Sequence, residues 1–218
     1  MDHPVNLCYT VLIKEARTVK QAEKTRLTID RILQAGIAEF GQNGYRGGRI
    51  NAICDAGINK GLIYHHFKNK DDLYLACVEK SFADMAEAIE TDMDKTGVPY
   101  YTARQHFFKT HDAEGRIFFE AAVNPPEHLR GPIAALKKPL DDLNRREFKK
   151  LLARQRLRPG ISEDMAYTFS EAVVNGYHMA FRQRDCRDEN FEEKLDRHER
   201  EGRQWIEMML FGIVEKGD

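Results

Sequence analysis

A glycine turn between two short helical segments constrains the fold of this chain more than any other feature. The turn is the Ala-Gly-Ile sequence at 56–58, and Asn59 after it can cap a helix, because its side-chain oxygen accepts from a backbone N–H two or three residues on. In that helix Ile63 and Phe67 are four residues apart and would both face inward. A helix of fewer than three turns is not stable alone, so the sequence predicts that it is docked on a helical scaffold.

The outer side of this short helix is basic and rich in flat, hydrogen-bonding side chains. It carries Lys60, Tyr64, His65 and Lys68. From residue 14 to residue 70 the chain has 11 lysines and arginines against 5 acidic residues, whereas from 71 to 218 it has 23 against 29. A short, docked, basic helix in the basic third of a chain is typical of a recognition helix that binds DNA.

Amphipathic periodicity predicts helices on both sides of this segment. Over 23–43 one stripe is apolar, and Gly36 within it would let a second helix come close. The stripe consists of Ile29, Ile32, Leu33, Ile37 and Phe40. Further helices are expected over 49–55, 71–94 and, between proline and glycine breaks, through most of the remainder. No stretch alternates as a strand does, so the predicted fold class is all-α.

Residues around the glycine turn follow a defined spacing. They are Phe40, Gly44, Tyr45, Ile50, Ile53, Ala56, Gly57, Ile58, Asn59, Lys60, Gly61, Leu62, Ile63, Tyr64, His65, His66, Phe67, Lys70 and Leu73. This pattern resembles the N-terminal domain of the TetR/AcrR repressors over roughly residues 24–82. The resemblance implies a three-helix helix-turn-helix domain over 22–70, after an N-terminal extension over 1–21 whose first twenty residues show no clear period. A helical ligand-binding and dimerisation domain over 71–218 would follow.

The chain departs from the family pattern at three places. One residue fewer lies between the second helix and Ala56, which shortens that helix or tightens the turn. Gly48 stands where a threonine or serine is usual, and it offers no hydroxyl to a phosphate. Leu62 stands where a threonine is common, so it can touch a thymine methyl group but cannot donate a hydrogen bond.

The resemblance implies a homodimer that binds a palindromic operator in double-stranded DNA, with its two recognition helices in successive major grooves. Lysines and polar rings on the outer face would bind phosphates, while Leu62 touches base edges and Gly61 permits close approach. The residues expected at the DNA are Arg46, Arg49, Asn59, Lys60, Gly61, Leu62, Tyr64, His65 and Lys70.

The C-terminal part is rich in aromatic residues, which could line a pocket for a small, largely apolar effector that releases the DNA. Ordinary core packing is the alternative for each of them. The pocket candidates are Phe107, Phe108, Phe118, Phe119, Tyr167, Asn175, Tyr177 and His178.

The last two helices carry apolar residues around most of their girth, and a second subunit would cover the side that the chain itself leaves open. On the first of them, Met165, Phe169, Val173, Tyr177 and Phe181 are interpreted as a single stripe. The expected dimer-interface residues are Phe169, Val173, Phe181, Trp205, Ile206, Met209 and Ile213.

No motif for catalysis, for a metal or for a cofactor is present, so no enzymatic activity is expected. The four cysteines are scattered without metal-ligand spacing, which indicates free thiols in a reducing compartment. No apolar run is long enough to cross a bilayer, so no membrane contact and a cytoplasmic location are expected.

Three functions fit the sequence to different degrees. The favoured one is a transcriptional regulator that responds to an effector, and we expect it to be a repressor. A constitutive DNA-binding or architectural protein without an inducer is the alternative. An enzyme with a helix-turn-helix appendage is the third, and no constellation of residues supports it.

Overall fold

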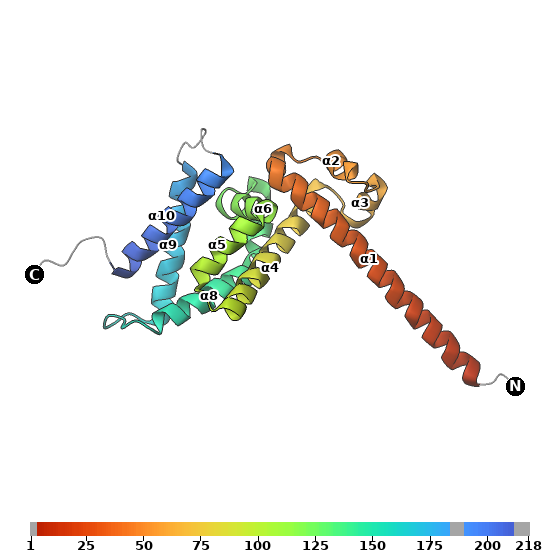
Figure 1. The fold of residues 1–218 in the computed structure, drawn as a ribbon, viewed down its shortest axis with the longest axis horizontal. Helices are drawn as coiled ribbons and strands as arrows, with labels where there is room; N and C mark the ends of the chain where they lie inside the picture. Colours follow the sequence, from red (N-terminus) through yellow and green to blue (C-terminus); the bar gives the residue numbers. More distant parts are fainter. Residues whose placement is uncertain (1–3, 184–189, 212–218) are drawn as a thin grey trace, which may run out of the picture. The chain divides into compact units, whose positions relative to one another are not determined.

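The computed structural model describes residues 4–183 and 190–211, with side chains from Lys20 onward apart from that of Arg182. Within these ranges every regular element is a helix (Figure 1), which confirms the predicted all-α class. By compactness the chain divides into two units, Met1–Cys77 and Val78–Asp218. No helix in the described part is long and apolar enough to cross a membrane.

The first unit contains three helices and the start of a fourth. In chain order they are α1 (Pro4–Gly47), α2 (Ile50–Asp55), α3 (Lys60–His66) and α4 (Lys70–Thr96), the last of which continues into the second unit. The second unit adds α5 (Tyr100–Thr110), α6 (Asp112–Val123), the 3-10 turn η1 (Glu127–Leu129), α7 (Arg130–Leu136), α8 (Lys138–Leu152), α9 (Glu163–Gln183) and α10 (Phe191–Phe211).

The first helix starts earlier than predicted. Its apolar stripe led to an expected start near Glu23, whereas α1 runs without interruption from Pro4. The sequence contains no glycine before Gly36 and no proline between Pro4 and Pro99, so nothing in this stretch breaks a helix. The regular helix ends at Gly44, whose φ of 65° is accessible to glycine at little cost.

The core of the first unit lies where α1 meets the helices that follow it. Gly36 allows α1 to approach α4 closely, as predicted, because a Cβ at this position would lie 2.8 Å from the Cys77 sulfur. The Phe40 ring packs edge-on against Tyr74, with centroids 5.2 Å apart. The buried core residues of this unit are Ile32, Leu33, Ile37, Phe40, Ile53, Ile58, Ile63, Phe67, Leu73, Tyr74 and Cys77.

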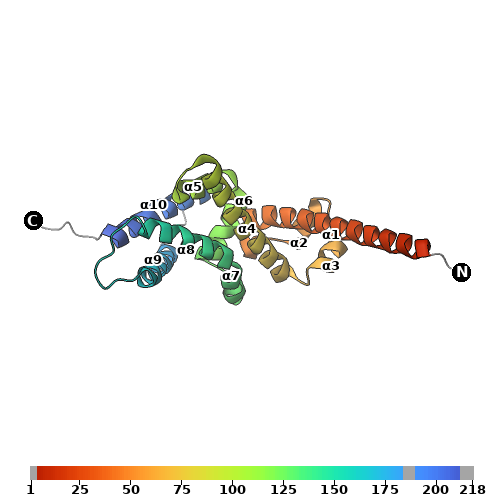
Figure 2. The same cartoon turned by 90° about the horizontal axis from the view of Figure 1, so that it is seen from below.

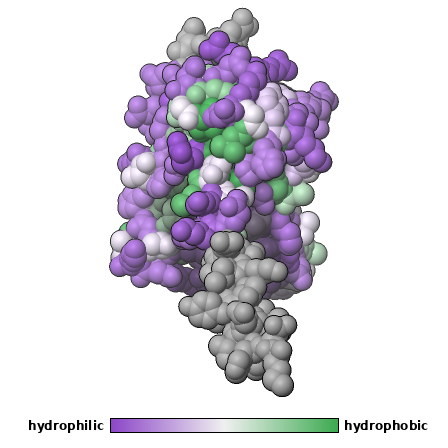
Figure 3. Space-filling view, turned by 90° about the vertical axis from the view of Figure 1, so that its right-hand side faces the viewer, coloured by the Kyte–Doolittle hydropathy of each residue, from purple (hydrophilic) through white to green (hydrophobic). Residues whose placement is uncertain are grey.

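The second unit is built from helix pairs that lie side by side, notably α5 with α6, α7 with α8, and α9 with α10 (Figures 1 and 2). The chain from Arg130 to Leu152 forms two helices, α7 and α8. Pro139 explains the break, because it lacks a backbone N–H and suits the first turn of α8 rather than a helix interior. The face of the molecule drawn in Figure 3 is mostly hydrophilic, with smaller hydrophobic areas among the hydrophilic side chains.

The single stripe predicted along α9 does not exist. Met165 and Phe169 are 57% and 58% exposed, whereas Tyr177 and Phe181 are 3% exposed. A spacing of four residues exceeds the 3.6-residue helical turn, so each step rotates the side chain by about 40°. Over four steps the stripe therefore passes from the solvent side of α9 to its core side.

Candidate nucleic-acid interface and aromatic core

The turn before α3 depends on glycine. Gly57 has a φ of +77°, which side-chain-bearing residues rarely adopt, and its N–H donates to the Cys54 carbonyl at 2.9 Å. Ile58 donates to the same carbonyl at 3.2 Å and is itself buried. The helix α2 is only six residues long, and these two bonds form the tight turn that leads from its end into α3. The short second helix expected from the sequence is therefore present.

Asn59 caps α3 as predicted. Its Oδ1 accepts from the Gly61 N–H at 2.7 Å, which satisfies one of the free donors at the helix start. The cap fixes the first turn of α3, where Lys60 and Gly61 are exposed. A direct contact of Asn59 with DNA stays a prediction.

The helix α3 has an inner and an outer face. Ile63 and Phe67 are 1% and 8% exposed and hold the helix on the core. On the other side Leu62 is 39% and Tyr64 48% exposed, and His65 is exposed beside them. The structure thus brings the predicted α3 residues together on one accessible face.

Lys70 lies apart from that face, at the start of α4. It is half-buried, with its Nζ 3.3 Å from the Arg46 carbonyl oxygen and 4.7 Å from the centroid of the Tyr45 ring. The Tyr45 hydroxyl donates to the Asp71 carboxylate, and burial followed by this contact raises the pKa of Tyr45 to about 12. The Lys70 ammonium is therefore held by the Tyr45 ring and the Arg46 backbone carbonyl.

Gly48 and Arg49 connect α1 to α2. A Cβ on Gly48 would lie 2.4 Å from the Phe40 ring, so this position has no room for the threonine or serine usual in the family pattern. The Arg49 N–H donates to Glu39 Oε1 at 2.9 Å, while the Arg49 residue as a whole is exposed. Glu39 thereby accepts from the N–H of the residue that precedes α2, whose own side chain makes no capping bond.

The predicted effector pocket divides into separate places. Phe107, Phe108 and Phe118 pack together and are buried. Tyr167 instead packs on Phe148, with ring centroids 6.0 Å apart. Asn175 is exposed on α9 and joins neither group, so the structure does not bring these eight candidates into one lining.

Phe119 turns away from its neighbour Phe118 toward α9 and α10. Its ring centroid lies 5.9 Å from that of Phe181 and 5.2 Å from that of His198. Tyr177 and His178, two other pocket candidates, also stack around His198. This second group, with Trp205 at its edge, is called the histidine cluster below: Phe119, Tyr177, His178, Phe181, His198 and Trp205.

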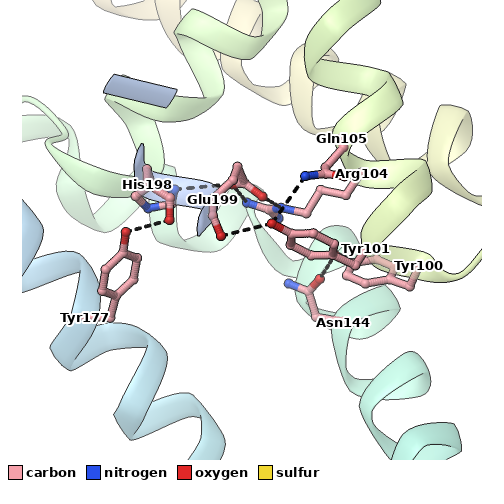
Figure 4. A network of polar contacts seen from close by, with 8 residues as sticks. All are labelled: Tyr100, Tyr101, Arg104, Gln105, Asn144, Tyr177, His198 and Glu199. Atoms are coloured by element: carbon pink, nitrogen blue, oxygen red, sulfur yellow. Dashed lines mark hydrogen bonds and ion pairs between the residues drawn. The ribbon is translucent and has the colours of Figure 1, made fainter. Parts of the chain in front are cut away.

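An ion pair that the sequence analysis missed lies beside the histidine cluster (Figure 4). The Arg104 guanidinium donates to both carboxylate oxygens of Glu199, each at 3.1 Å, and their side chains are 15% and 9% exposed. Burial alone would raise the pKa of Glu199, but the charge of Arg104 and the hydrogen bonds from His198 and Arg104 lower it to about 2. Glu199 is therefore a carboxylate at neutral pH, bonded in the bidentate manner that arginine favours.

Backbone carbonyls of α10 anchor the same region. The Tyr177 hydroxyl donates to the His198 carbonyl at 2.6 Å, and the Tyr101 hydroxyl donates to the Glu199 carbonyl at 3.0 Å (Figure 4). His198 Nδ1 lies 3.2 Å from Glu199 Oε1. Side chains of α5 and α9 are thus bonded to one turn of α10.

The residues predicted for a dimer interface do not share one environment. Phe169 is exposed, whereas Val173, Trp205, Ile206 and Met209 are half-buried. Phe181 is buried under the Arg197 guanidinium, 4.3 Å from its ring, so it cannot form a surface between subunits in this conformation. Ile213 lies outside the described residues.

In the part of the chain that the structure describes, no group of three or more His, Cys, Asp or Glu side chains could hold a metal ion. Cys54 and Cys77 are free thiols, and burial raises the pKa of Cys77 to about 12. A thiol with so high a pKa stays protonated and unreactive.

Comparison with known proteins finds similar sequences among bacterial transcriptional regulators. Residues 32–77 match the profile described as "Bacterial regulatory proteins, tetR family". The HTH-type transcriptional repressor SCO4008 of Streptomyces coelicolor is 38% identical over 74 residues, which are 34% of this chain and 38% of that protein. The HTH-type transcriptional repressor AcnR of Corynebacterium diphtheriae is 25% identical over 67% of this chain and 76% of its own length.

Solved structures share the fold along most of the chain. The transcriptional regulator FadR from Bacillus subtilis, solved in complex with stearoyl-CoA, superposes with a TM-score of 0.57 at 16% identity, covering 84% of this chain and 98% of that one. These relatives are regulators and not enzymes, in agreement with the sequence prediction. Over residues 32–77 the chain thus matches the TetR family of bacterial regulatory proteins, as the sequence resemblance predicted.

Proposed function

We propose that this protein is a DNA-binding transcriptional repressor in which α3 enters the major groove. The outer face of α3 carries the proposal, because Lys60, Leu62 and Tyr64 are exposed there while Ile63 and Phe67 hold the helix from behind. Cations and hydroxyls on such a face bind phosphates, and Leu62 reads a thymine methyl group. The names of SCO4008 and AcnR as repressors support repression over activation.

Around this face Lys70 and the exposed Arg46 and Arg49 would add phosphate contacts. Lys70 is held by the Tyr45 ring and the Arg46 carbonyl, so it would position the domain on the backbone and carry no base specificity. Binding to an operator also implies that the protein works in the cytoplasm.

A homodimer would cover the apolar side chains that α9 and α10 leave in water. The most exposed are Met165, Phe169, Met179, Met208 and Phe211. Exposed apolar groups on two adjacent helices are typical of a subunit interface, and a twofold dimer would match a palindromic operator. Val173, Trp205, Ile206 and Met209 are half-buried and can complete the interface, but Phe181 is no longer among its candidates.

We expect an effector to bind in the aromatic core of the second unit and to release the DNA. An effector acts only by its different affinity for the DNA-binding and the released conformations. FadR, which shares the fold, was solved with stearoyl-CoA bound, and the apolar acyl chain of that molecule supports an effector with an apolar part here.

Selection from random DNA duplexes with the full chain tests the proposal. We expect enrichment of an inverted repeat whose half-sites lie about one helical turn, roughly 34 Å, apart. Bound but unenriched DNA would identify an architectural protein, and no retained DNA would end the proposal.

Sedimentation of Phe169→Asp tests the dimer. A carboxylate in the interface should yield monomers, whereas Thr110→Asp on the exposed end of α5 should leave the dimer intact. A dimer that survives Phe169→Asp would place the interface elsewhere.

A further inference from the structure

His198 has one ring nitrogen without a hydrogen-bond partner among the described residues. The residue is 3% exposed, and the unpartnered atom is Nε2. Buried side-chain nitrogens nearly always have a partner, because losing water without replacement costs free energy. A buried atom of this kind therefore calls for a partner that the described residues do not supply.

The protonation of the ring follows from its neighbours. Glu199 is a carboxylate and can only accept, so His198 Nδ1, at 3.2 Å, carries the proton and donates. The Arg104 guanidinium already balances the charge of Glu199, and a cationic His198 would add an uncompensated buried charge. The ring is therefore neutral, and its Nε2 presents a lone pair that needs a donor.

The rings packed around His198 are aromatic. The His198 ring centroid lies 4.9 Å from that of Phe181, 5.1 Å from Tyr177 and 5.2 Å from each of Phe119 and His178. Phe119 and His178 are half-buried, so the histidine cluster extends from the interior to the surface of the unit. A molecule that replaces one of these rings would meet flat apolar walls and a single acceptor.

We propose that the histidine cluster is the effector site and that His198 Nε2 selects aromatic or apolar molecules carrying one O–H or N–H donor. The proposal names the chemical class of the effector and rests on the proposed function only in calling that molecule an effector. Apolar walls provide the affinity, and the single acceptor distinguishes a donor from its apolar isostere, because an unpaired buried nitrogen penalises the isostere.

The position of His198 gives the bound molecule a route to the rest of the unit. The neighbouring Glu199 accepts from Arg104 of α5, and the backbone carbonyl of His198 accepts from the Tyr177 hydroxyl of α9 (Figure 4). A ring displaced by the effector would therefore move α9 against α10, the two helices proposed to form the dimer interface. The effector would then make different contacts in the two conformations, and this difference in affinity is what shifts the protein from one to the other.

Phenol and toluene test the proposal, because they have nearly the same shape and differ in one O–H donor. Binding to the full chain, without DNA, would be measured by calorimetry and by displacement of one by the other. Toluene should win in a purely apolar site, since it is the more apolar molecule. We expect phenol to bind about tenfold more tightly, as one good hydrogen bond allows.

The variant His198→Phe keeps the ring and removes the acceptor, so it should reverse the preference to toluene. Ser81→Ala is the matched control, because Ser81 Oγ is likewise buried and has no hydrogen-bond partner among the residues that the structure describes. This variant should retain the preference for phenol. Binding of neither probe, a preference for toluene in the wild type, or an unchanged preference in His198→Phe would overturn the proposal.

Nitrogen NMR of histidine-labelled wild-type protein decides the question if His198→Phe does not fold. The Nε2 resonance of His198 should be that of an unprotonated nitrogen and should shift with phenol but not with toluene. A protonated Nε2, or one that phenol leaves unmoved, would contradict the proposal. Because no DNA is present, this outcome is independent of whether an operator is found.

Discussion

The two units of the molecule place their charges in opposite ways. In the first, the cations around α3 stand outside an interior built from side chains such as Ile53, Ile63 and Phe67. In the second, Arg104 and Glu199 lie inside, 15% and 9% exposed. The first unit thus keeps its charges available to a partner, whereas the second uses a charge pair to fix the packing of its own helices.

This difference has an energetic consequence. An exposed cation can be removed with little effect on folding, because water already solvates it. Removing one member of a buried pair leaves the other charge without compensation. Mutations at the two sites should therefore separate function from stability.

The largest effect is expected from Arg104→Met. It leaves the Glu199 carboxylate buried without its guanidinium and should lower the free energy of unfolding by about 3–5 kcal/mol, measured by urea denaturation. The double variant Arg104→Met/Glu199→Leu should recover most of the loss. Lys138→Met breaks an exposed pair with Asp142 and should cost less than about 1 kcal/mol. Equal costs for Arg104→Met and Lys138→Met would erase the contrast between buried and exposed charges on which the comparison of the units depends.

Acidification should lower the free energy of unfolding through buried groups of the second unit. Burial, followed by the charges of Lys137 and Arg104, lowers the pKa of His178 from 6.5 to about 3. The unfolded chain then binds a proton that the folded chain does not, so stability falls by about 1.4 kcal/mol per pH unit as the pH drops from 6.5 toward 3. Glu199, with its pKa held at about 2, adds a second loss as the pH falls below 4.5.

Urea denaturation at pH values from 7 to 4.5 measures this loss. His178→Phe keeps a ring in place and should flatten the dependence between pH 6.5 and 4.5. A wild-type stability that does not change over this window would show that His178 protonates freely in the folded protein.

A smaller effect is expected from Asn59→Ala in the first unit. It removes the acceptor at 2.7 Å from the Gly61 N–H and should cost about 1 kcal/mol of stability. Asn59→Asp keeps an acceptor and serves as the control. If both variants are as stable as the wild type, the cap does not hold the first turn of α3.

The first unit was predictable because its signals are local. The turn at Gly57, the cap at Asn59 and the inward pair Ile63 and Phe67 all lie within eleven residues, and the structure contains each of them. The extent of α1 was not predicted, since the absence of helix breakers after Pro4 is a weaker signal than an amphipathic stripe.

The second unit was harder to predict because its key contacts are remote. Arg104 and Glu199 are 95 residues apart, and neither alone reveals the other. A signal did exist, because Arg104 lies within the apolar spacing of Tyr100, Ala103 and Phe107, where a charge must be buried with a partner. Along α9 the error was one of period, since a four-residue spacing does not stay on one helix face.

The salt dependence of DNA affinity tests the central claim, that the outer face of α3 binds DNA, most directly. Each phosphate contact contributes about 0.9 to the slope of log affinity against log salt concentration, so Lys60→Ala in a dimer should reduce that slope by about 2 without loss of stability. Lys109→Ala, an exposed lysine on α5, should leave the slope unchanged. An unchanged slope for Lys60→Ala, or equal slopes for both variants below that of the wild type, would contradict the account.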